Sequence, residues 1–214
     1  MATLEIYWSF RSPYSYLATA RLLEIKSTYA LDVDFRPVRP LALREPDFFS
    51  RGRKQFVPYL LKDVFREAQR MNIVIQWPNP DPVKMDLVSG SVDPAQPIMV
   101  RLMSLGIAAV VAGQGIEFAT NVSQSTWTGV EGWHEDDALG EAARRAGLDL
   151  VELDRWIEAN PKKIAEMIAH NEAAQLVHHW GVPLMVLDGE PFFGQDRLDA
   201  LVWRLDQRGL KKAD

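Results

Sequence analysis

Residues 3–16, TLEIYWSFRSPYSY, decide the fold class because they contain a strand signal followed at once by a helix start. Residues 3–10 are rich in β-forming side chains and lead directly into Arg11-Ser12-Pro13. A serine followed by proline is typical of a helix N-terminus, since serine caps free N–H groups and proline fits the first helical position. The chain is therefore predicted to open with a strand, a tight loop and a helix.

The following segments complete a βαβ unit. Apolar residues recur along the predicted helix at spacings of four, three and four residues, which places them on one face: Ala18, Leu22, Ile25 and Tyr29. Residues 31–37 then alternate apolar and polar side chains and end at Pro37, as expected for a strand with one buried face. Strand, helix and strand in this order are read most economically as a βαβ unit.

A helical block follows, and β structure returns only near the C-terminus. Helices are predicted over 54–71, 98–113, 135–146 and 161–180, with Pro-rich connectors at 77–84 and 91–97. Residues 184–187 and 191–193 flank Asp188-Gly189, which is a two-residue hairpin signal. A last helix follows, with an apolar stripe formed by Leu198, Leu201, Val202 and Leu205.

The order βαβ, helical block, ββα predicts an α/β fold. The two β-containing ends each expose an apolar face that the other can cover, so they are expected to form one mixed sheet. We assign residues 1–40 and 181–214 to that domain, 161–180 to a connecting helix, and 41–160 to a large all-helical insertion.

The composition excludes several classes of function. The 214 residues carry a formal net charge of −5, which argues against a nucleic-acid partner because such proteins need clustered positive charge. No apolar run is long enough for a membrane span. The N-terminus lacks the pattern of an export signal, so a cytoplasmic location is expected. Cysteine is absent, so any sulfur chemistry must come from a bound small molecule.

Three segments are candidates for chemistry. Ser12 either caps the predicted helix only, or also donates to a ligand thiolate held at the positive helix end. Val182-Pro183 precedes the buried strand; a cis bond there would leave the Val182 backbone free to pair with a peptide-like ligand, whereas trans is the commoner form. Gln195 and Asp196 begin the last helix, where Asp196 is either a cap or an acceptor for a ligand ammonium group.

Together the stretches SFRSPYSYLA and GVPLMVLDGEPFFGQDRL resemble the 2-hydroxychromene-2-carboxylate isomerases and the kappa-class glutathione transferases, a branch of the DsbA-like thioredoxin superfamily. The resemblance implies a thioredoxin-like fold, glutathione as cofactor and a small-molecule substrate, and it suggests a homodimer. It also implies that Ser12 activates the glutathione thiol, that Val182 and cis-Pro183 hold the cysteinyl backbone, and that Gln195 and Asp196 bind the γ-glutamyl end. Ser12-Pro13-Tyr14-Ser15 replaces the Cys-Pro-X-Cys of DsbA, so dithiol chemistry is ruled out.

These implications leave three functions open. A glutathione-dependent isomerase of an aromatic or conjugated carboxylate is preferred; a kappa-type transferase or a non-catalytic binding module are the alternatives. The family often has an asparagine and a Pro-Pro pair after the second strand, whereas this chain has LALREPD at 41–47, so the glycyl side of the site is unassigned. Arg51, Arg53 and Lys54 are candidates for it, although a solvated surface is the simpler interpretation.

Other side chains give weaker signals. Three tryptophans are expected either to line an aromatic cleft or to form plain core: Trp77, Trp127 and Trp133. His178 and His179 are adjacent on a predicted helix and point about 100° apart, so they cannot chelate together, and no metal site is expected.

Overall fold

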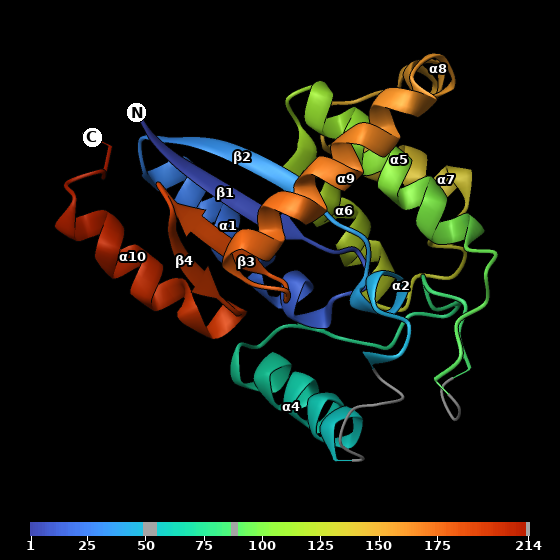
Figure 1. Cartoon of the computed structure of the whole chain (residues 1–214), viewed down its shortest axis with the longest axis horizontal. Helices are drawn as coiled ribbons and strands as arrows, with labels where there is room; N and C mark the ends of the chain where they lie inside the picture. The colour runs from blue at the N-terminus through green and yellow to red at the C-terminus, as the bar shows by residue number, and fades with distance from the viewer. Residues whose placement is uncertain (49–54, 87–89, 213–214) are drawn as a thin grey trace.

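A four-stranded mixed sheet forms the centre of the structure, a computed structural model that describes residues 1–48, 55–86 and 90–212 (Figure 1). The strand order is β2-β1-β3-β4. β2 runs parallel to β1, β3 runs antiparallel to β1, and β4 returns antiparallel to β3. The strands are β1 Ala2–Trp8, β2 Leu31–Pro37, β3 Leu184–Leu187 and β4 Glu190–Phe193. The predicted βαβ unit and C-terminal hairpin are both confirmed.

The strand register brings the candidate segments to one end of the sheet. Tyr7 near the end of β1 pairs with Leu184 at the start of β3, and Leu184 pairs with Phe193 at the end of β4. The loop after β1, the turn before β3 and the segment after β4 therefore lie at the same end of the sheet. Because strand polarity fixes this arrangement, residues that are more than 170 positions apart in the sequence become neighbours.

Helices cover both faces of the sheet. α1 (Pro13–Thr28) buries its predicted face in the main core, where it meets alternate residues of β1, Leu4 and Ile6. Tyr7 points to the opposite face and packs with residues of β3 and, from α9 (Pro161–His178), Ala174. α1 and α9 therefore lie on opposite faces of the sheet (Figure 1). This alternation along β1 is what buries the strand on both sides.

Within the described residues, the remaining helices lie between β2 and α9, apart from two that follow β4. They are α2 Leu41–Arg44, α4 Phe56–Arg70, α5 Pro97–Val111, α6 Gly115–Trp127, α7 Asp136–Arg145 and α8 Leu150–Ala159, followed after β4 by the 3₁₀ helix η1 Gln195–Arg197 and by α10 Leu198–Gln207. The main core includes Leu102 and Phe118 of this block together with Ile6 of the sheet. The assignment of residues 41–160 to a separate inserted domain stays a prediction.

The structure differs from the sequence-based expectation in several elements. β1 ends at Trp8 rather than residue 10, and α9 ends at His178 rather than residue 180. The patterns considered above do not predict α6 or α8, since α6 is rich in Ser, Thr and Asn and is packed on several sides. Residue 54, the predicted start of the helix that becomes α4, lies outside the described ranges. Within those ranges no helix combines the length and apolarity needed to cross a membrane.

Candidate active site

Ser12 is the N-cap of α1, and its hydroxyl oxygen accepts the backbone N–H of Ser15 at 3.1 Å. The Ser12 N–H donates to Ser9 O at 3.0 Å, which closes the tight loop between β1 and α1. Because the oxygen accepts the capping bond, the hydroxyl hydrogen remains available to a further acceptor. Ser12 is half-buried, so a ligand can reach it.

One backbone donor in the first turn of α1 also remains available. Pro13 has no N–H, the Ser15 N–H is used by Ser12, and the Tyr16 N–H donates to Ser12 O at 3.1 Å. The Tyr14 N–H makes no hydrogen bond to any residue that the structure describes. The Ser12 hydroxyl and the Tyr14 N–H are therefore two donors beside the positive end of the helix, which favours an anion there.

The Val182–Pro183 peptide bond is cis, as the resemblance implied. Pro183 O accepts the N–H of Gly194 at 2.9 Å, which joins the turn before β3 to the segment after β4. The N–H and C=O of Val182 have no hydrogen-bond partner among residues 1–48, 55–86 and 90–212. Val182 packs against the buried cluster that Tyr7 and Leu184 form with Val38 and Val186. An extended peptide-like ligand can pair with these free backbone groups as an added strand does.

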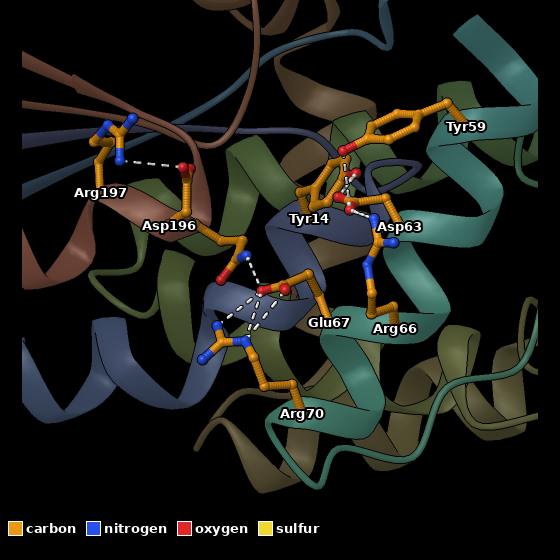
Figure 2. Close-up of polar contacts among 9 residues, drawn as sticks. Tyr14, Tyr59, Asp63, Arg66, Glu67, Arg70, Asp196 and Arg197 are labelled. Atoms are coloured by element: carbon orange, nitrogen blue, oxygen red, sulfur yellow. Dashed lines mark hydrogen bonds and ion pairs between the residues drawn. The ribbon is translucent and has the colours of Figure 1, made fainter. Parts of the chain in front are cut away.

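Gln195 and Asp196 lie at the same end of the sheet but in different environments. Gln195 is buried, and its side-chain N–H donates to Glu67 Oε2 of α4 at 3.0 Å. Asp196 is exposed and pairs with Arg197 at 3.2 Å. Figure 2 shows Asp196 pointing toward Arg197 and away from α4. η1 also contacts α1, so both residues are held near the helix that Ser12 caps.

α4 contributes carboxylates to the site that sequence analysis missed. Tyr14, two residues after Ser12, donates to Asp63 Oδ2 at 2.7 Å, and Tyr59 and Arg66 donate to the other oxygen of the same carboxylate (Figure 2). Burial, reinforced by the bond to Asp63, raises the pKa of Tyr14. The bonds from Arg66 and Tyr14 lower the pKa of Asp63. At neutral pH the pair is therefore a phenol that donates to a carboxylate.

A carboxylate outside α4 holds the loop before Ser12. Arg11 donates two hydrogen bonds to Asp81, from its Nε–H to Oδ1 at 2.6 Å and from its Nη2–H to Oδ2 at 2.8 Å. Asp81 also accepts the Val83 N–H at 2.8 Å. The contacts of Asp63, Glu67 and Asp81 have a weak sequence signal, which is the presence of carboxylates in the predicted helix 54–71 and in the Pro-rich connector 77–84. This signal does not identify the partner of any of them.

Other expectations are corrected or stay open. Trp127 and Trp133 are fully buried, so for these two the cleft interpretation is wrong and they are core residues. Trp77 is half-buried and packs edge-on against Trp127 with ring centroids 5.4 Å apart. Arg51, Arg53 and Lys54 lie outside the described residues. No group of three or more His, Asp or Glu side chains in the described parts of the chain is placed to hold a metal ion.

Comparison with known proteins places these features in a family. The model of the DSBA-like thioredoxin domain matches residues 3–206. The chain is 23% identical over 207 residues to 2-hydroxychromene-2-carboxylate isomerase of Sphingobium xenophagum, covering 93% of this chain and 95% of that protein.

Solved structures show the same fold. A selenomethionine 2-hydroxychromene-2-carboxylate isomerase superposes with a TM-score of 0.67 at 21% identity, covering 96% of this chain and 95% of that one. The cytosolic disulfide reductase DsbM from Pseudomonas aeruginosa with GSH gives a TM-score of 0.59 at 14% identity, covering 96% and 99%. Since the family model extends over nearly the whole chain, this protein belongs to the DSBA-like thioredoxin domain family.

Proposed function

We propose that this protein is a glutathione-dependent isomerase that acts on an aromatic or conjugated carboxylate. One observation carries the proposal: a chain without cysteine places the free hydroxyl hydrogen of Ser12, the free N–H of Tyr14 and the free backbone of Val182 at one end of its sheet. That arrangement suits a ligand with an extended peptide backbone and a thiol. The 23% identical relative named as an isomerase supports the choice of reaction.

Glutathione fits these groups from one end to the other. Its cysteinyl N–H and C=O would pair with the Val182 backbone, and its γ-glutamyl ammonium and carboxylate would meet Asp196 and the donors around Gln195. Its sulfur would then lie near Ser12. Hydrogen bonds to a thiolate lower the pKa of a thiol from its free value of about 8.5, and each unit of lowering corresponds to about 1.4 kcal/mol. A helix N-terminus and one charge-assisted hydrogen bond together supply an energy of this size.

The reaction proceeds by reversible addition. The thiolate sulfur forms a bond to an activated carbon of the substrate, and the electron pair of the C=C bond moves through the conjugated system to an oxygen. The former double bond is now single and rotates. Return of the electron pair re-forms the double bond and expels the thiolate, so glutathione is regenerated and the substrate leaves as its isomer.

Calorimetric titration with glutathione and an isomerisation assay with 2-hydroxychromene-2-carboxylate test the proposal. The wild type is expected to bind glutathione and to isomerise the substrate without consuming glutathione. Ser12→Ala should lose most activity, whereas Ser27→Ala, at the exposed end of the same helix, should retain it. Stoichiometric loss of glutathione with 1-chloro-2,4-dinitrobenzene, without isomerisation, would indicate a transferase instead. No binding at millimolar glutathione would indicate a binding module.

A further inference from the structure

Arg44 differs from every other arginine that the structure describes. Each of the others forms an ion pair with a carboxylate within 4 Å, whereas Arg44 forms none with any carboxylate in residues 1–48, 55–86 and 90–212. Its guanidinium donates instead to three neutral oxygens. They are the backbone oxygen of Arg39 at 2.9 Å, the side-chain Oε1 of Gln175 at 2.9 Å and the backbone oxygen of Trp180 at 3.0 Å. A guanidinium has five N–H donors, so two remain for a further acceptor.

The described residues around Arg44 offer its charge no carboxylate as a direct partner. Arg44 is half-buried, and burial lowers its pKa, which means that the environment disfavours its positive charge. The nearby carboxylate of Glu172 accepts from Arg39 through both oxygens, at 2.8 and 2.7 Å. Glu45, the other nearby acid, is exposed. Partly buried charges are normally paired, so this guanidinium is suited to an incoming anion.

The position of Arg44 connects it to the ligand-binding turn. Arg44 is the last residue of α2, the helix that follows β2. It donates a hydrogen bond to the backbone oxygen of Trp180, which lies two residues before Val182. Gln175, which is fully buried, accepts from Arg44 and donates to Gly181 O at 2.7 Å. Arg44 is therefore fixed beside the backbone that is proposed to hold the cysteinyl residue, and it comes from a different element than Gln195 and Asp196.

We infer that Arg44 binds a ligand carboxylate in the active site, through the two guanidinium N–H groups that its protein partners leave free. The inference rests on the proposed function, since it assigns the residue that an anionic end of glutathione or of the substrate would meet. Two carboxylates have this chemistry, the glycyl carboxylate of glutathione and the carboxylate of the isomerised substrate. The experiment separates them.

The binding arm compares glutathione with glutathione whose glycyl carboxylate is amidated. If the glycyl end is the ligand, Arg44→Gln weakens glutathione binding about 10- to 100-fold in calorimetry, the range for a charged hydrogen bond. Binding of the amidated form then stays as in the wild type, which also shows that the variant is folded. Arg44→Lys, which keeps the charge, should lose less affinity than Arg44→Gln. As a control, Arg208→Gln removes the positive charge that pairs with Asp188 at the other end of the sheet. It should change the affinity for neither glutathione nor amidated glutathione.

The kinetic arm uses 2-hydroxychromene-2-carboxylate at saturating glutathione. If the substrate carboxylate is the ligand, Arg44→Gln leaves glutathione affinity unchanged and raises KM about 10-fold or more, with a smaller change in kcat. Equal weakening of glutathione and its amidated form would overturn the inference, because it shows that Arg44 only supports the turn. Unchanged affinity and unchanged KM would also overturn it. A wild type that binds neither compound would refute the proposed function itself, and that result does not depend on any Arg44 variant.

Discussion

The side-chain amide of Gln195 donates to Glu67 Oε2 at 3.0 Å and joins η1 to α4 across 128 residues of sequence (Figure 2). Arg70 donates to the same oxygen at 2.8 Å. These two bonds, with that from Arg70 the larger cause, lower the pKa of Glu67. An ionised carboxylate therefore orients the buried amide that is proposed to meet the γ-glutamyl end of glutathione.

Glu67→Ala should weaken both the fold and the site. It leaves the buried Gln195 amide without its acceptor, which is expected to lower the free energy of unfolding by about 1 to 3 kcal/mol. Glutathione affinity should fall as well, because Gln195 is no longer oriented. Urea unfolding and calorimetry measure the two effects. The side chain of Arg70 is 63% exposed. Arg70→Ala keeps the hydrogen bond between Gln195 and Glu67 and serves as the control. Equal losses in the two variants would contradict the role given to Gln195.

Two substitutions at Ser12 separate helix capping from chemistry. Ser12→Ala removes both the cap and the hydroxyl, so the free energy of unfolding should fall by about 1 kcal/mol. Ser12→Asn caps a helix nearly as well but has no hydroxyl, so stability should be close to that of the wild type. Isomerase activity should be lost in both variants. An active Ser12→Asn enzyme would show that the hydroxyl is not needed.

Stability should fall with acidification because of His179. Burial lowers its pKa below 6.5, and its Nδ1 accepts the Gly181 N–H at 2.9 Å, which requires the neutral ring. Since the unfolded state takes up the proton more readily, this contribution is present above about pH 6.5 and is lost as the pH falls through the folded-state pKa. His179→Gln should flatten the dependence measured by thermal unfolding between about pH 8 and pH 5. A slope in His179→Gln equal to that of the wild type would contradict this role of His179.

Two helical glycines are expected to respond oppositely to alanine. A Cβ at Gly106 of α5 would lie 2.8 Å from the ring of Phe10, which is fully buried just before the Ser12 loop. Gly106→Ala should therefore cost about 1 to 3 kcal/mol by overpacking. Within 4 Å, a Cβ at Gly140 of α7 would meet Leu150 alone among the described residues, at 3.7 Å. Gly140→Ala should stabilise the protein by up to about 1 kcal/mol through helix propensity. Chemical denaturation of both variants checks the pair, and destabilisation of Gly140→Ala would refute the argument.

Local patterns predicted the helix that Ser12 caps and the strand that follows Val182, but they placed Gln195 at the start of the last helix, whereas it lies in the 3₁₀ helix η1 before α10. Ser12-Pro13 marked the start of α1, and Asp188-Gly189 marked the hairpin of β3 and β4, because capping and turn formation depend on a few neighbouring residues. The sequence patterns did not predict α6, because packing against neighbouring helices, rather than its own apolar periodicity, makes this segment helical. Trp127 and Trp133 show the same limit, since a tryptophan in a core and one in a cleft look alike in a sequence.

The sequence by itself determined the βαβ and ββα order, the absence of a protein thiol and the position of the helix start at Ser12. Only the tertiary structure decided which polar groups have partners. Asp63 and Glu67 of α4 accept hydrogen bonds from Tyr14 and Gln195, whereas the partners of Arg44 in the described part of the chain are neutral oxygens alone. The physical reason is that capping and periodicity act over a few residues, while a charge is paired or unpaired according to groups that the fold brings from far along the chain.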